Sequence, residues 1–435
     1  MTRRWRLPDE GDGLGTFAAK PWVDIDRNDR IWLTFEDGRA SGSDVVLARE
    51  VESSWDMAIP SLGLGDFHQD ARVAAYDDDH AILVWNRSGA FLELQNEVRV
   101  GAPGGRLVEP PGGGRFSFAP YAIQNEVQAH PDGEVFLTWN QGLDDGGRRG
   151  ICIANRFGSE ADFHRPKNQL DVVSRSFIFS NNPEVARNTR GDTVVTWFES
   201  FGERLRVASS ERYGLDGRFT IANDADALSP PEGDVEDPEP AVAEDGRAVI
   251  VWRQVLPSGK MAVFMSERPN RGAWSRPSMD EPFSEVVDNA WHTRVAFAPG
   301  GDLYVVWEQK IGTDWSVMLA HRAPDGRWLA SGKEALRLSG QPAIDPVLRV
   351  AADGTVVVAW RARFGTHWRV MERHSAVDAE GATEAERWSA AVALSPIGRD
   401  AGAPAIAVAR HANARGHRVV VAWSHDGQIF RATLD

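Results

Sequence analysis

Runs of alternating hydrophobic and polar residues, separated by polar turns, repeat along the whole chain. Each copy reads as a short β run, a turn with Gly, Asp or Asn, and a second β run that closes on an aromatic residue, as in NEVQAHPDGEVFLTW and PVLRVAADGTVVVAW. This alternation predicts half-buried strands joined in hairpins. The copies close at Phe35, Trp85, Trp139, Trp197, Trp252, Trp307, Trp360 and Trp423.

The spacing of the closing aromatics predicts the architecture. Successive aromatics are 50 (35 to 85) to 63 (360 to 423) residues apart. A third β run follows each of them, and then a fourth segment often opened by a turn and an aromatic, as in DGRF (216–219) and RGAW (271–274). Eight copies of four short strands predict an all-β fold, a single eight-bladed β-propeller over residues 1–435. Seven blades with an irregular appendage is the alternative, because the first copy closes on Phe35 and the last has a longer turn.

The last copy stops after its third β run, IFRATL, and has no fourth segment. Residues RRWRLP (3–8) resemble the fourth segments of other copies and precede the first repeat without a hairpin of their own. We therefore expect the N-terminal segment to supply the outer strand of the last blade, which covers the edge of that sheet. The closing aromatics recur at one place in every copy, which predicts core packing and not ligand stacking.

Composition narrows the class of protein. Asp and Glu number 63 against 48 Lys and Arg, a net charge of −15 without a basic patch, so neither nucleic acid nor a membrane is expected as a partner. The single cysteine, Cys152, allows no intrachain disulfide, and the alternation GICIANRF predicts that its thiol is buried. No long apolar run follows the N-terminus, so we expect a cytoplasmic protein or a mature secreted form. We also expect a monomer, because a closed propeller covers its own edges.

The repeat P-x-V-A-x-D-G-x-V-V-V-W, followed by G-x-W, resembles bacterial propeller repeats of the sialidase-like superfamily. The resemblance covers nearly the whole chain, although the Asp-box S-x-D-x-G-x-T-W of sialidases is not matched. It implies a propeller fold. Proteins of that kind include glycosidases, polysaccharide lyases, lectins and interaction scaffolds, so the resemblance implies no single function.

One row of positions does not follow the repeat. Packing usually repeats one residue type around a propeller, whereas the position thirteen residues before the aromatic carries Arg, Glu, Glu, Glu and Arg in blades 2 to 6. From blade 1 to blade 7 this row reads Trp22, Arg72, Glu126, Glu184, Glu239, Arg294 and Val347, and the last copy offers Ala405. The row two positions earlier is also polar, with Asp70, Gln124, Asn182, Asp237, His292 and Asp345. The first strand of a blade lies nearest the propeller axis, so we expect both rows at the mouth of the axial channel.

These residue types suit an acidic carbohydrate. The three glutamates could act as acid and base in glycoside hydrolysis while Arg72 and Arg294 bind a sugar carboxylate. His292 with Arg294 would instead suit a lyase, in which a base removes the proton beside a uronate carboxylate. Calcium held by the glutamates and Asp237 is a third interpretation, and no other cofactor is expected. A salt-bridged set of charges that only fills the channel is the fourth.

The two residues after each closing aromatic differ in every copy, as in Asn86-Arg87 and Glu308-Gln309, and we expect them in loops on the same rim. A lectin with eight equivalent sites would repeat its ligand residues, so this divergence predicts one asymmetric site. The predicted function is binding of one ligand, an acidic carbohydrate, and its cleavage by a glycoside hydrolase or polysaccharide lyase reaction. The alternative is a non-catalytic scaffold that binds protein or glycan.

Overall fold

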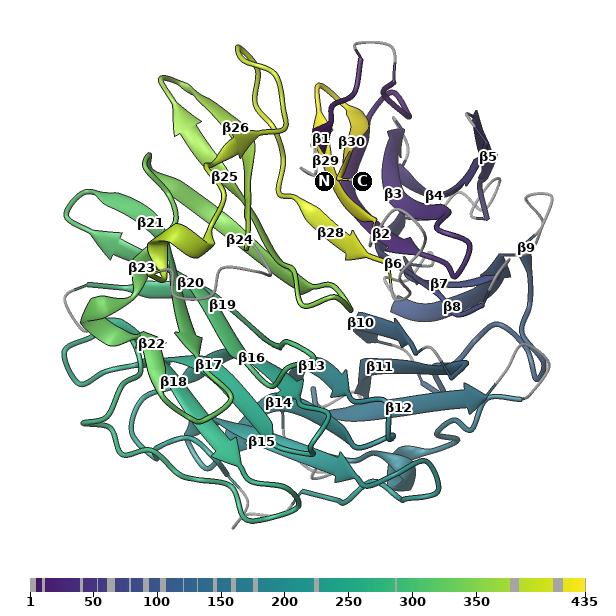
Figure 1. The fold of residues 1–435 in the computed structure, drawn as a ribbon. Coiled ribbons are helices and arrows are strands. Elements are labelled where there is room, and N and C mark those ends of the chain that lie inside the picture. Colours follow the sequence, from purple (N-terminus) through teal and green to yellow (C-terminus); the bar gives the residue numbers. More distant parts are fainter. Residues whose placement is uncertain are drawn as a thin grey trace. The chain divides into compact units, whose positions relative to one another are not determined.

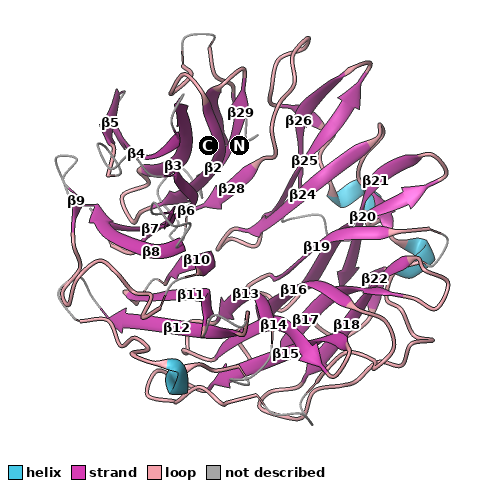
Figure 2. Ribbon diagram, turned by 180° about the vertical axis from the view of Figure 1, so that it is seen from behind, coloured by secondary structure: helices cyan, strands magenta, loops and turns pink. Residues whose placement is uncertain are grey.

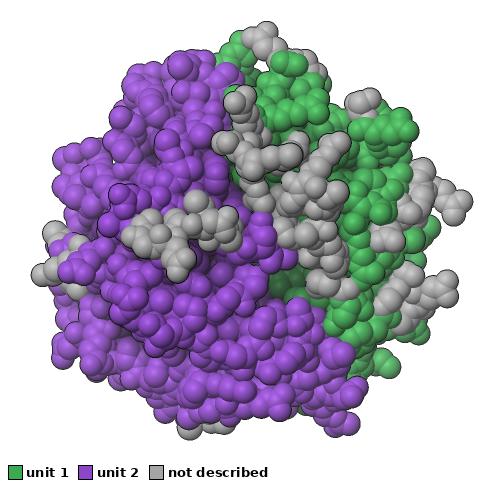
Figure 3. Space-filling model, viewed as in Figure 1, with its two compact units in different colours: residues 1–172, 399–435 green, residues 173–398 purple. Residues whose placement is uncertain are grey.

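The computed structural model describes the whole chain except residues 1–4, 10–11, 40–41, 53, 61–66, 78–79, 89–93, 102–106, 120, 131, 144–146, 158–161, 175–178, 223–226, 286–287, 376–382, 410–417 and 435. It divides into two compact units (Figure 3). Unit 1 comprises Met1–Val172 and Arg399–Asp435, and unit 2 comprises Val173–Gly398. Whether the chain behaves as the single domain expected from the repeats therefore stays a prediction.

Unit 1 contains the sheets of blades 1, 2, 3 and 8 (Figure 1). Successive strands within each blade pair antiparallel, so each sheet is built of hairpins. The strands are β2 (Ala18–Ile25), β3 (Ile31–Arg39), β4 (Gly42–Val51) and β5 (Ser54–Ala58) in blade 1, β6 (Phe67–Ala75), β7 (Ala81–Ser88), β8 (Leu94–Gly101) and β9 (Leu107–Val108) in blade 2, β10 (Ala122–Ala129), β11 (Glu134–Gly142) and β12 (Arg149–Phe157) in blade 3, and β28 (Ala405–Val408), β29 (Val419–His425), β30 (Gln428–Leu434) and β1 (Trp5–Arg6) in blade 8.

Unit 2 contains the sheets of blades 4 to 7, built in the same order. The first strands of successive blades lie side by side (Figure 1). The strands are β13 (Ser180–Arg187), β14 (Thr193–Phe201) and β15 (Arg204–Arg212) in blade 4, β16 (Val235–Val242), β17 (Ala248–Val255) and β18 (Met261–Arg268) in blade 5, β19 (Ala290–Phe297), β20 (Leu303–Ile311), β21 (Asp314–Arg322), β22 (Trp328–Ala330) and β23 (Leu336–Arg337) in blade 6, and β24 (Ala343–Val350), β25 (Val356–Phe364), β26 (His367–His374) and β27 (Val392–Ala393) in blade 7.

The strand order confirms the eight-bladed β-propeller. The first copy forms a complete blade, β2 to β5, in which Phe35 is as buried as the tryptophans of the other blades, so the seven-blade alternative is wrong. The predicted fourth segment is less regular than the other three. In blade 5 it meets β18 through separate backbone hydrogen bonds, such as Ser275 N–H to the Glu267 carbonyl at 2.7 Å, and forms no continuous ladder.

The N-terminal segment supplies the outer strand of the last blade, as predicted. In the antiparallel pair of β1 and β30, Trp5 is opposite Leu434 and Arg6 is opposite Thr433. Residues 3 and 4 of the predicted segment lie outside the described residues. The two ends of the chain thus meet in one sheet.

The closing aromatics are core residues, as predicted. All eight are at most 1% exposed. In blade 5, the Trp252 indole N–H donates to Gln254 Oε1 at 3.0 Å, and the Gln254 amide donates to the Pro230 carbonyl at 3.0 Å. Trp139 and Trp307 make the same bond to the glutamine two residues further along. Each such tryptophan therefore both fills the core and secures the loop that enters its blade.

The structure also shows the environment of the cysteine and the helical content of the chain. Cys152 is fully buried in β12, and burial raises the pKa of its thiol well above the usual value. The described helical residues are three 3₁₀ turns, η2 (Gln169–Asp171), η4 (Gly332–Glu334) and η5 (Ala385–Arg387) (Figure 2). Among the described residues, no helix has the length and apolar character needed to span a membrane.

Candidate functional site

A β-bulge interrupts the first strand of seven blades, at the polar row found in the sequence. The pairing of first and second strands shifts register there, as it does between Trp291 and Arg294. The bulge residue has a left-handed backbone, with φ 49° at Asp237 and 45° at His292. Asp, Asn and His adopt this conformation more readily than most residues with a side chain, so the backbone explains part of the polar row. The equivalent residues are Lys20, Asp70, Gln124, Asn182 and Asp345.

In unit 1 the row of charged positions forms a chain of contacts across blades 1 to 3. The Arg72 guanidinium lies 4.4 Å from the centre of the Trp22 ring, and Arg72 Nε is 3.9 Å from Glu126 Oε2. The Asp70 N–H donates to Glu36 Oε1 at 2.8 Å. Glu126 is only 8% exposed, so its contact with Arg72 is largely removed from water.

In unit 2 the same row brings Glu239 and Arg294 together. Arg294 Nη1 donates to Glu239 Oε1 at 2.5 Å, and the side chains are 33% and 18% exposed for Arg294 and Glu239. Burial raises the pKa of the Glu239 carboxyl, while the Arg294 and Arg349 guanidinium groups oppose that shift. Such a carboxyl keeps its proton to a higher pH than an exposed glutamate.

The three glutamates of the row are divided between the units. Glu126 lies on β10 in unit 1, whereas Glu184 and Glu239 lie on β13 and β16 in unit 2. Glu184 and its bulge neighbour Asn182 are half-buried, as is Gln124 on β10. That the three carboxylates form one cluster therefore stays a prediction.

His292 is joined to the neighbouring blade through Glu308, the residue that follows the closing Trp307. His292 Nδ1 is 2.7 Å from Glu308 Oε1, and the Asp345 N–H donates to the same oxygen at 2.5 Å. Asp345 in turn accepts from Arg361 Nε at 2.5 Å. Glu308 is 2% exposed, so a nearly buried carboxylate links the bulge residues of blades 6 and 7.

The residues after the closing aromatics are not in loops, which corrects the expectation from the sequence. The second strands continue past the aromatic, as β20 does to Ile311, and Glu308 lies opposite Trp291. In this position the side chain of the residue after the aromatic contacts the bulge residue of the same blade. In blade 5, Arg253 Nη2 is 3.1 Å from Asp237 Oδ2. In blade 1, the residue after the aromatic, Glu36, pairs in the same way with the bulge residue Lys20, with Lys20 Nζ 3.2 Å from Glu36 Oε1. The partners of the bulge residues are therefore the residues that immediately follow the closing aromatics, a position that can be read from the sequence.

We name the eight residues at the bulges of blades 5 to 7 the unit 2 cluster. They are Asp237, Glu239, Arg253, His292, Arg294, Glu308, Asp345 and Arg361. The hydrogen bond to Glu308 raises the pKa of His292, against the opposing effect of burial. The nearby Asp345 carboxylate also raises it, and Arg294 lowers it. The cluster thus holds an imidazole that favours its cationic form beside a carboxyl that favours its neutral form.

Three side chains of the cluster bring together atoms that could bind a metal ion. One ligand atom each from His292, Glu308 and Asp345 lies within 4.8 Å of the others. Asp345 is paired with Arg361, however, and Asp237 and Glu239 of the predicted calcium set are paired with Arg253 and Arg294. Arginine thus stands beside each of these carboxylates where a cation would bind. In this arrangement the carboxylates and arginines could release one another and form hydrogen bonds with a polar ligand.

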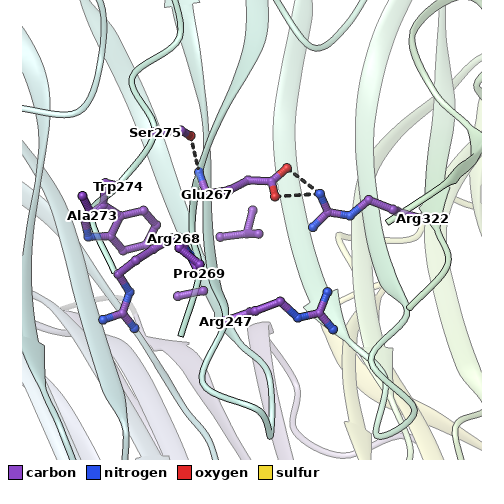
Figure 4. A pocket seen from close by; sticks show the side chains of 10 residues that line it. Arg247, Glu267, Arg268, Pro269, Ala273, Trp274, Ser275 and Arg322 are labelled. Carbon is purple, nitrogen blue, oxygen red and sulfur yellow. Dashed lines mark hydrogen bonds and ion pairs between the residues drawn. The ribbon is translucent and has the colours of Figure 1, made fainter. Parts of the chain in front are cut away.

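A cavity of about 350 Å³ lies elsewhere in unit 2, between β18, the segment 269–275 and the end of β21 (Figure 4). Three arginines line it, and intramolecular partners engage them. Arg322 Nη1 donates to both Glu267 oxygens at 2.6 Å, and Arg268 pairs with Glu211 at 2.7 Å and covers the Trp274 ring at 5.4 Å. Arg212 with Phe219 and Arg322 with Trp328 repeat this stacking in blades 4 and 6. We therefore infer that Arg212, Arg268 and Arg322 hold the fourth segments of their blades in place, whereas Arg247 pairs with Asp245.

Comparisons with known proteins add information on the fold. No protein-family model and no curated protein sequence matches the chain. Similar solved structures include polysaccharide lyase Uly1, with 10% identity over 79% of this chain and 86% of that chain and a TM-score of 0.50. An ulvan lyase of a new polysaccharide lyase family has 11% identity over 96% and 95% of the two chains, with a TM-score of 0.48. An α-L-arabinanase from Penicillium chrysogenum has 12% identity over 87% and 99%, with a TM-score of 0.43. At this identity, the likeness to Uly1 shows a common propeller fold.

Proposed function

We propose that the protein binds an acidic carbohydrate at the unit 2 cluster. The observation that carries the proposal is the chain of contacts from His292 through Glu308 to Asp345, with the pair of Arg294 and Glu239 beside it. Sugar hydroxyls both donate and accept hydrogen bonds, and a uronate adds a carboxylate that a guanidinium binds well. A cluster in which carboxylates, arginines and an imidazole alternate offers partners for all of these groups. Uly1, which has this fold, is a polysaccharide lyase, and this agrees with a glycan ligand.

The same groups favour cleavage of the bound glycan as a second function. Glu239 has a raised pKa because it is buried, which suits an acid that protonates a leaving sugar oxygen. Arg294 beside it suits a uronate carboxylate, whose neutralisation makes the adjacent C–H more acidic. Hydrolysis adds water across the glycosidic bond. Elimination transfers that C–H proton to a base, breaks the C–O bond to the leaving sugar, whose oxygen takes a proton from an acid, and leaves a double bond in the product. The products therefore distinguish the two reactions.

Binding and cleavage can be tested with polygalacturonate, alginate and hyaluronan, with starch and arabinan as neutral polymers. We expect an acidic polymer to stabilise the wild-type protein in thermal unfolding. Arg294→Met should weaken that binding by about tenfold to a hundredfold, the value of one charge-assisted hydrogen bond. Glu239→Gln should bind the polymer but release no product, read as new reducing ends and as ultraviolet absorption of unsaturated sugars.

Arg247→Met is the matched control, because Arg247 belongs to the same unit but pairs with Asp245 at a turn. It should behave as the wild type. If no acidic polymer binds, or if Arg247→Met weakens binding as much as Arg294→Met, the proposal is wrong and the non-catalytic scaffold becomes the better description. Binding without product would retain the ligand and exclude the cleavage.

The affinity for the acidic polymer should decrease as the pH rises through the raised pKa of His292. Below that pKa the imidazole is a cation that attracts the sugar carboxylate. Above it the imidazole is neutral, and the charges of Glu308 and Asp345 face the ligand with less compensation. Titration calorimetry at constant ionic strength measures the effect. His292→Gln should flatten the profile, and an unchanged slope in that variant would assign the pH dependence to another group.

A further inference from the structure

Two tryptophans beside the unit 2 cluster differ from those that close the blades. Trp291, the residue before the bulge in β19, is 38% exposed, whereas the closing tryptophans are at most 1% exposed. Its ring centre is 5.3 Å from that of Trp315 on β21, with the ring planes at 44°. Trp315 is half-buried. Exposing large aromatic rings to water is unfavourable, so a partly exposed pair beside a polar cluster indicates a ligand surface.

The tryptophan pair is continuous with the cluster. The Arg253 guanidinium lies 5.1 Å from the Trp291 ring centre, and Arg253 Nη2 is also 3.1 Å from Asp237 Oδ2. The Trp291 and His292 ring centres are 6.1 Å apart. Arg253, Trp291 and Trp315 thus form a ladder of planar groups that starts at the bulge of blade 5 and ends on the third strand of blade 6.

The length of the ladder bears on the size of the ligand. Trp291 and Trp315 lie on the first and third strands of blade 6, two strand spacings apart in the backbone, or about 10 Å. A pyranose ring presents a face of C–H groups that packs on an aromatic ring, while its hydroxyls bond to groups at the edge, here the cluster and Lys310 opposite Trp315. The ring centres of His292 and Trp291 are 6.1 Å apart and those of Trp291 and Trp315 are 5.3 Å apart, so a sugar chain that leaves the cluster at His292 can pass over Trp291 to Trp315.

We propose that Trp291 and Trp315 form a subsite for further sugar residues of an acidic oligosaccharide, so the protein takes a chain of several residues that runs from the cluster outward over blade 6. This inference rests on the proposed function, because one glycan occupies both places. It goes beyond that function because it identifies the ligand as a polymer and not as a monosaccharide.

The test is a chain-length series measured by titration calorimetry. The probes are fragments of one, two, four and six residues of the acidic polymer that binds in the screen, whether polygalacturonate, alginate or hyaluronan. For the wild type we expect affinity to increase with length. Trp315→Ala should leave the affinity for the monosaccharide unchanged and reduce that for the hexasaccharide by about tenfold, and Trp315→Phe should restore most of it. Trp291→Ala should act in the same direction.

Tyr121→Ala serves as the matched control, because Tyr121 is 46% exposed and lies in unit 1. It should leave the whole series unchanged. If acidic fragments bind but Trp315→Ala matches the wild type at every length, the subsite is wrong and the proposed function stands. If affinity does not depend on length in the wild type, the subsite is also wrong. If no acidic fragment binds at all, the proposed function fails and the subsite with it. A melting temperature close to the wild type shows that each variant is folded.

Discussion

Replacing Trp252 by alanine should lower the free energy of unfolding by about 3 to 5 kcal/mol, the range for deleting a large aromatic side chain from a packed core. Trp252 is fully buried, and it packs in the core between blades 4 and 5 with Ile250 and Phe264. The substitution also leaves the buried Gln254 without its indole donor, which loosens the bond to the Pro230 carbonyl. Denaturant unfolding followed by tryptophan fluorescence and circular dichroism measures the loss.

Trp252→Phe separates the loss of the aromatic ring from the loss of the indole hydrogen bond. It keeps an aromatic ring and removes the N–H, so we expect a loss of about 1 to 2 kcal/mol. Trp315→Ala, at a half-buried position, should cost less than about 1 kcal/mol. Equal losses for Trp252→Ala and Trp315→Ala would contradict the assignment of the closing tryptophans to the core.

Replacing His321 by leucine should cost about 3 kcal/mol, because it leaves two carboxylates in a largely buried place without their common partner. His321 is fully buried, with Nδ1 2.7 Å from Glu384 Oε2 and Nε2 2.8 Å from Asp302 Oδ1. Its ring stacks on Tyr304 at 4.3 Å. The Asp302 side chain is 26% exposed, so water relieves part of the penalty and we expect the lower end of the range for broken buried pairs.

A second substitution separates the stranded charge from the loss of packing. Adding Glu384→Gln to His321→Leu should recover about 1 kcal/mol or more, since it removes the charge of a largely buried carboxylate that has lost one of its partners and keeps the Trp388 indole N–H at 3.1 Å. His164→Leu, at an exposed histidine in unit 1, should change the free energy of unfolding by less than about 0.5 kcal/mol. If the double variant is less stable than His321→Leu, the loss of the partner of the two carboxylates does not account for the effect.

Most of the fold could be predicted because each blade repeats one requirement. A bulky aromatic must occupy one fixed position of the second strand to fill the core, and its spacing gives the blade count. The fourth segments were less predictable. In blade 5 the Val263 N–H donates to the Ser284 hydroxyl at 3.0 Å, where a regular strand would offer a carbonyl. The same bond recurs once per blade in blades 4 to 7, at Ser229, Ser284, Ser339 and Ser395. A single serine per blade is not visible in the two-residue alternation that identifies a β strand.

The candidate site could be predicted in part. Counting back from the aromatic selected Glu239 and Arg294, which come from neighbouring blades and are in contact. Glu308 is expected from the sequence on the same rim, but in a loop and not as a site residue, because the sequence does not show that β20 continues beyond Trp307. Counting back also gave no sign of the bulge, which brings the residue after the aromatic next to His292. A change of pairing by one residue depends on backbone geometry, which residue types indicate only weakly.

The pairing of β1 with β30 has a consequence for synthesis on the ribosome. Trp5 is translated 429 residues before its partner Leu434 (5 to 434). Blade 8 therefore cannot be completed until Leu434 has left the ribosome, and closing so long a loop is slow compared with forming the hairpins of blades 1 to 7. Until β1 pairs with β30, a nascent chain displays an open edge at its newest blade, where a chaperone or a second nascent chain on the same message can bind.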